Sequence, residues 1–173
     1  VGSAIFGFAI IVGLFLPQVL PGSGGTTSFS RGDGPGQVFA ELRATHLSDG
    51  TIFNEYNSVP ATSGSHYDQP LPWGIEVSPV PDERMVHNLE HGGVAIQYNT
   101  EDEDLIARLE EFAEKQTGYP CFLKVAPYQG METTIAVTAW TVMDTMEEYD
   151  EDRLQAFVNA YRNDGPERVP CTQ

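Results

Sequence analysis

Apolar residues recur every three or four positions in two segments of the chain, residues 101–116 and residues 150–162. This spacing places apolar side chains on one face of a helix, so it predicts two amphipathic helices. Glycines follow both segments, at Gly118 and Gly165, and glycine commonly ends a helix. The expected inward faces are Leu105, Leu109 and Phe112 on the first helix, and Leu154, Phe157, Val158 and Tyr161 on the second.

Three other segments read as strands. Residues 94–98 alternate apolar and polar side chains, and residues 122–127 and 133–143 are apolar and rich in β-formers. Residues 82–91 predict one or two helical turns, which Gly92 and Gly93 would end. The order strand, helix, strand, strand, helix predicts an α+β fold, in which a mainly antiparallel sheet has helices packed on one face.

The first residues differ from the rest of the chain. Residues 1–20 carry no charge and are nearly all apolar or small, which suits one transmembrane helix; a cleaved signal peptide is the alternative. Residues 21–36 are rich in Gly, Ser, Thr and Pro, as in a flexible tether. We therefore expect a lipid-embedded helix over 1–20, a tether over 21–36 and a domain over 37–173. No basic residue precedes Arg31, which favours a single-pass protein with its domain on the periplasmic or external side of the cell membrane.

Charge excludes some partners. The chain has 25 acidic and 9 basic residues and a formal net charge of −16. Such a surface repels nucleic acid and anionic lipid headgroups, so we expect neither as a ligand. Hydrophobic residues make up 40% of the chain, enough for a packed core.

Two cysteines, Cys121 and Cys171, lie far apart in the sequence. Outside the cytoplasm such a pair predicts a disulfide that ties the C-terminal tail to the domain. Free thiols and metal ligation are the alternatives.

Four histidines carry the clearest chemical signal. His87 and His91 lie four residues apart in HNLEH, a spacing that places both imidazoles on one helical face, as two ligands of one metal ion require. His66 lies in a turn-rich loop, where a rigid turn can present a third imidazole. His46 is a further ligand or a residue that supports the ligands. Hydrogen-bonded histidines without metal are the structural alternative.

The choice of metal depends on the other donors. Met131 lies in a turn between two expected strands, and a thioether beside three imidazoles favours copper; imidazoles with water would suit zinc. HNLEH also fits the inverted zinc-protease signature, in which Glu90 would be the general base of a zinc-dependent hydrolase. That motif requires a long helix, whereas Gly92 and Gly93 follow at once. The expected metal ligands are therefore His66, His87, His91 and Met131, with copper preferred, zinc second and no catalytic residue.

Three long motifs resemble a known family: YNSVPATSGSHY (residues 56–67), VHNLEHGGVAIQY (86–98) and APYQGMETTIAVTAW (126–140). Together with THLSDG around His46 and the closing AYRNDGPE, they resemble domain of unknown function 3105 over most of residues 46–166. The resemblance implies a membrane-tethered extracytoplasmic domain and places His46, His66, His87, His91 and Met131 at family positions. It implies no activity.

These observations favour a copper-binding accessory subunit, which is not itself an enzyme, anchored beside integral membrane subunits of a larger complex. A copper-dependent membrane monooxygenase is one conceivable host. The alternatives are the zinc-dependent hydrolase and a purely structural subunit without metal.

Overall fold

The computed structural model of the chain describes residue 2 and residues 34–171. The expected membrane helix over 1–20 and the tether up to residue 33 thus lie outside the described residues, apart from Gly2. Within the described part, every helix is too short or too polar to cross a bilayer.

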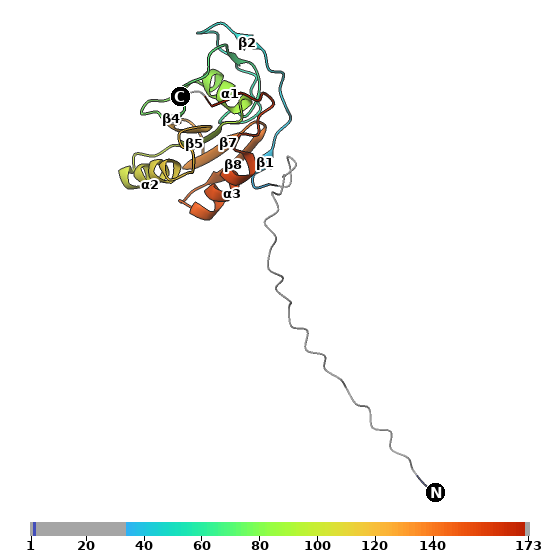
Figure 1. Ribbon diagram of the computed structural model, residues 1–173, viewed down its shortest axis with the longest axis vertical. Coiled ribbons are helices and arrows are strands. Elements are labelled where there is room, and N and C mark those ends of the chain that lie inside the picture. Colours follow the sequence, from blue (N-terminus) through green and yellow to red (C-terminus); the bar gives the residue numbers. More distant parts are fainter. Residues whose placement is uncertain (1, 3–33, 172–173) are drawn as a thin grey trace.

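Eight strands and three helices form in the described part of the chain (Figure 1). The strands are β1 (Gln37–Val38), β2 (His46–Leu47), β3 (His66–Tyr67), β4 (Gly74–Ile75), β5 (Val94–Tyr98), β6 (Leu123–Pro127), β7 (Ile135–Ala139) and β8 (Val142–Met146). The helices are α1 (Asp82–Glu90), α2 (Glu103–Glu114) and α3 (Glu151–Tyr161).

Six of these strands form one sheet in the order β1-β8-β7-β5-β6-β4, and β2 and β3 form a separate parallel pair. In the large sheet, β1/β8, β8/β7 and β7/β5 are antiparallel, whereas β5/β6 and β6/β4 are parallel. The α+β class and the mainly antiparallel sheet are therefore confirmed.

The helices do not all lie on one face of the sheet, so that part of the expectation was wrong. Apolar residues of α2 and α3 pack with Val94 and Ile96 of β5, whereas those of α1 pack with Ala95 of the same strand. Successive side chains of a strand point to opposite faces, so α1 covers the face opposite to α2 and α3. All five residues of β5 are buried for this reason, and the polar position Gln97 does not mark a solvent face.

The single strand expected over residues 133–143 is also wrong, because the chain forms a hairpin there. β7 ends at Ala139, β8 begins at Val142, and Trp140 and Thr141 form the turn. Thr141 has φ of 65°, a conformation that usually requires Gly or Asn. Its backbone N–H donates to the carbonyl of Thr62 at 2.9 Å, a typical hydrogen-bond distance. This bond holds the turn against a distant loop.

The C-terminal strap, residues 162–171, returns to the end of α1. The N–H of Asn163 donates to the carbonyl of Gly92 (2.7 Å), and that of Glu167 donates to the carbonyl of Glu90 (3.1 Å). The strap ends in the disulfide between Cys121 and Cys171, which confirms the expected pairing. Gly92 has φ of +88°, and a Cβ there would meet the backbone nitrogen of Asp164 at 2.9 Å, so the close docking of the strap requires glycine.

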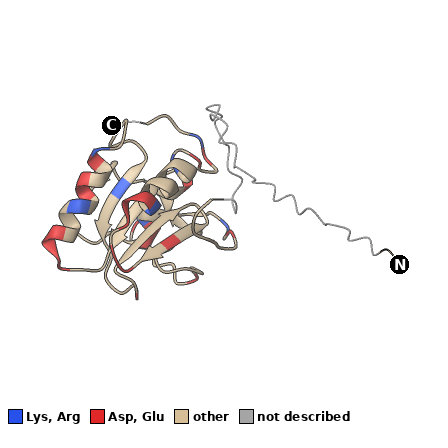
Figure 2. Cartoon of the chain, turned by 90° about the horizontal axis from the view of Figure 1, so that it is seen from below, with Lys and Arg blue, Asp and Glu red and all other residues tan. Residues whose placement is uncertain are grey.

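Asp and Glu lie chiefly on the helices and connecting loops, whereas most of the sheet is uncharged (Figure 2). Two of the aspartates have a local role. The carboxylate of Asp102 accepts from the N–H groups of Asp104 and Leu105 at the start of α2, and that of Asp150 accepts from Arg153 at the start of α3.

Candidate metal centre

The HNLEH segment forms the last turns of α1. His87 lies within the helix and His91 is its C-terminal cap, so the two residues keep helical spacing. Their Nε2 atoms are 3.2 Å apart. The expected pair of imidazoles on one helical face is therefore present.

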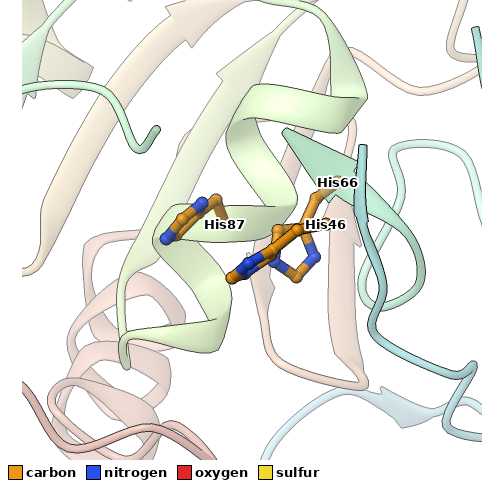
Figure 3. Close-up of side chains that lie close together, drawn as sticks. All are labelled: His46, His66 and His87. Carbon is orange, nitrogen blue, oxygen red and sulfur yellow. The ribbon is translucent and has the colours of Figure 1, made fainter. Parts of the chain in front are cut away.

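The loop before α1 brings two more imidazoles to this face. β2 and β3 pair in parallel with His46 opposite His66, although 20 positions separate them in the chain. The ring centroid of His87 lies 4.9 Å from that of His66 and 5.4 Å from that of His46. Figure 3 shows these three side chains together, His87 on α1 and the other two on the paired strands.

Backbone carbonyls fix the orientation of two rings. His87 Nδ1 lies 2.6 Å from the carbonyl oxygen of Tyr67, and His66 Nδ1 lies 2.9 Å from that of Gly64. A carbonyl oxygen can only accept, so each Nδ1 carries the proton and donates it. In the neutral rings each Nε2 then carries a lone pair, and that of His87 lies 3.2 Å from His91 Nε2. Histidines that bind metals are commonly oriented in this way.

Glu90 brings a carboxylate into the cluster. Its Oε2 lies 3.0 Å from His66 Nε2 and 4.0 Å from His46 Nε2. The side chains of His66 and Glu90 are 0% and 7% exposed, and neither His66 Nε2 nor Glu90 Oε2 has a hydrogen-bond partner among the described residues. In the neutral ring, with the proton of His66 on Nδ1, two electron-rich atoms face each other in a buried site. Such an arrangement is costly unless a cation lies between them.

His87 is held neutral. Burial of its ring lowers its pKa from 6.5 to about 4, and the neighbouring imidazoles of His91, His66 and His46 act in the same direction. The hydrogen bond to the carbonyl of Tyr67 opposes this shift only in part. Because only neutral imidazole can bind a metal, His87 is ready to do so over the physiological pH range.

The donors form two overlapping triads that share His87. The first is His46, His66 and His87, and the second is His87, Glu90 and His91; within each, the ligand atoms lie within 4.8 Å of one another. Two atoms that each lie about 2.0–2.2 Å from a tetrahedral ion are about 3.3–3.6 Å apart. The His87–His91 pair of the second triad, at 3.2 Å, is close to this value, and Glu90 Oε2 lies 3.0 Å from His66 Nε2 and 4.0 Å from His46 Nε2 of the first triad.

Two further carboxylates border the cluster. Asp68 Oδ1 lies 3.2 Å from His46 Nδ1, and Glu167 Oε2 lies 3.4 Å from His91 Nε2. His46 is half exposed and His91 is 15% exposed, so these two imidazoles face the outside of the cluster. Neither Asp68 nor Glu167 was expected from the sequence, because each approaches its histidine only through the folded loop or strap.

Met131 is not brought to the histidines. It lies in the turn after β6, and its carbonyl accepts from the side chain of Asn99, directly beyond the end of β5. His91, in contrast, precedes the start of β5, so the two residues lie at opposite ends of this strand. The Met131 side chain is buried at 4% exposure. Its expected role beside the imidazoles is therefore not supported by its position.

A family model described as "Protein of unknown function (DUF3105)" matches residues 47–173, and the chain belongs to this family. The match begins one residue after His46 and includes the other four residues of the cluster. Neither the curated proteins nor the solved structures contain a match.

Proposed function

We propose that this member of the DUF3105 family binds one divalent transition-metal ion through the triad His46, His66 and His87, with the carboxylate of Glu90, next to His66, as a further donor. The observation that carries the proposal is the buried contact between His66 Nε2 and Glu90 Oε2, two atoms that lack a hydrogen bond. A metal ion bound by both atoms would remove their repulsion. The carbonyl partners of His66 and His87 hold the Nδ1 protons, which leaves each Nε2 as the atom that can bind a metal; in the metal-free protein that of His87 contacts His91 Nε2.

Copper(II) is the first candidate and zinc the second. Imidazole nitrogen and carboxylate oxygen suit both ions, and copper(II) binds such donors more tightly than the other divalent ions of the first transition row. With Met131 at the other end of β5, its thioether is not close enough to the imidazoles to favour copper(I). The proposal is therefore for the oxidised ion.

Holding the metal, rather than hydrolysis, is the role that we propose. A general base must stand free of the metal to take a proton from bound water. The Oε2 atom of Glu90 instead lies 3.0 Å from His66 Nε2 and 4.0 Å from His46 Nε2, close enough to share a metal ion with them, and its side chain is almost fully buried. We extend this proposal to an accessory subunit at the outer face of a membrane, next to integral membrane subunits. Its support is the uncharged segment over residues 1–20 and the acidic domain that follows it.

Metal uptake by the full chain, purified in detergent and stripped with a chelator, tests the binding site. After equilibration with copper(II) or zinc and gel filtration, elemental analysis should find about one ion per chain. His87→Ala should reduce this to background. Met131→Leu is the matched control and should retain the ion, because Met131 is buried elsewhere. Wild-type protein that takes up neither ion would contradict the proposal.

A further inference from the structure

A pocket opens beside the cluster of histidines, and His91 forms part of its wall. Its volume is about 610 Å³, and it is lined by residues 70–73, Pro120, Val169, Pro170 and His91. This volume is within the range of small-molecule sites in proteins. Among these side chains His91 is the one that titrates, and the others are proline, leucine, valine and tryptophan.

The wall formed by residues 70–73 is fixed from behind. The side chain of Asn88 on α1 accepts from the N–H of Leu71 (2.8 Å) and donates to its carbonyl (2.9 Å). Lys124 on β6 donates to the carbonyl of Pro72 (2.8 Å) and contacts the carboxylate of Glu76 (2.7 Å). Both Asn88 and Lys124 are buried. Such contacts shape the pocket before any ligand binds.

Trp73 and the C-terminal strap complete the pocket. The Trp73 ring lies 5.2 Å from the ring of Phe122, and a Cβ on Gly93 would meet it at 2.7 Å, so the indole packs closely against the backbone. On the other side the strap supplies Val169 and Pro170, directly before the disulfide at Cys171. Both walls are therefore attached to the folded domain.

The lining determines which molecules fit. No lining side chain carries a fixed charge, and the titratable one, His91, also contacts Glu167, which disfavours an anion. The apolar walls suit a ring or a branched alkyl body. Nε2 of His91 already contacts His87 and Glu167, so Nδ1 is the ring nitrogen left to hydrogen-bond a ligand. We propose that the pocket binds a neutral, ring-sized apolar molecule with a single hydroxyl group, directed at His91. When a metal ion occupies the proposed site, the hydroxyl group of the bound molecule would lie next to the histidines that hold the ion. This placement rests on the proposed function.

Fluorescence of Trp73 in the full-length protein tests the pocket, with 4-methylphenol as the probe. In metal-free protein, 4-methylphenol should change the emission saturably and bind about tenfold more tightly than toluene, which lacks the hydroxyl, or than 4-methylbenzoate, which is an anion. Trp73→Phe reports the background from Trp140, which is buried at 2% exposure. Val169→Phe should weaken binding at least tenfold by filling the pocket.

Three results would overturn this inference: no saturable change with 4-methylphenol, equal affinity for 4-methylbenzoate, or unchanged affinity in Val169→Phe. The assay is independent of the metal. Binding of 4-methylphenol to a protein that takes up no metal would refute the proposed function and leave the pocket in place. Metal uptake without 4-methylphenol binding would do the reverse.

Discussion

His66 Nε2 lies 3.0 Å from Glu90 Oε2 in a part of the domain that is closed to solvent, and the two atoms do not form a hydrogen bond. His66 Nδ1 donates its proton to the carbonyl of Gly64, so in the neutral ring Nε2 has no proton. With neutral His66 and ionised Glu90 this contact is unfavourable, and a cation between the two atoms would make it favourable. A buried polar pair without a hydrogen bond is a feature that a bound ion would explain.

Glu90→Gln should have opposite effects on stability and on metal binding. The amide can donate to the lone pair of His66 Nε2, so the free energy of unfolding of the metal-free protein should rise by about 1 kcal/mol. Loss of the carboxylate should weaken copper(II) binding by at least about tenfold. Urea denaturation at pH 8 in the presence of a chelator, and copper(II) titration, measure the two effects.

Glu148→Gln makes the same chemical change at an exposed position and is the matched control. It should leave both quantities unchanged. If a proton rather than a metal joins His66 and Glu90, then Glu90→Gln would lower the stability of the metal-free protein instead. That result would count against the metal site.

The two triads can be separated by substitution of one histidine from each. His46 belongs only to the first triad and His91 only to the second. We expect His46→Ala to weaken copper(II) binding by more than about 100-fold, because it removes a ligand, and His91→Ala to weaken it by less than about tenfold. Competition with a chelator of known affinity measures both. The reverse order would move the ion to the second triad, with His87, Glu90 and His91.

The sequence predicted those parts of the fold that have a local signal. Both long amphipathic helices are present, and their apolar spacing reflects burial of one face. The strand over residues 94–98 is also present, and all five of its residues are buried. The hairpin at Trp140 and Thr141 was missed because the turn contains none of the usual turn residues and is held by a contact to Thr62. The position of α1 was missed because the sheet is buried on both faces.

The site was predicted to a similar extent. His87 and His91 share a helical face, a relationship that spacing alone reveals. The approach of His46 to His66 depends on the pairing of two strands of two residues each, which is too short to produce a periodic pattern. Met131 was assigned to the site because it lies in a turn. The sequence does not show at which end of the sheet this turn is located, and it is at the end away from His91.

The disulfide should stabilise both the domain and the pocket. Cys121 and Cys171 are 50 positions apart, and closing a loop of that length contributes up to about 4 kcal/mol by restricting the unfolded chain. Replacing both cysteines with serine should lower the midpoint of thermal unfolding and weaken 4-methylphenol binding, since Val169 and Pro170 adjoin Cys171. Copper(II) binding should persist, because α1 and the paired strands hold the ligands. A double variant with wild-type thermal stability would contradict this prediction.

Acid should destabilise the metal-free protein through His87. The pKa of His87 is about 4 in the folded protein and near 6.5 in the unfolded chain, so between these values the unfolded chain binds the additional proton. The free energy of unfolding should therefore fall as the pH decreases from 6.5 to 4, by on the order of 2–3 kcal/mol from this residue. His87→Gln, which does not titrate, should lose this part of the pH dependence, whatever its effect on stability at pH 7. Urea denaturation of both proteins at pH 4, 5, 6 and 7 in the presence of a chelator measures the difference, and parallel curves would show that His87 is not the group responsible.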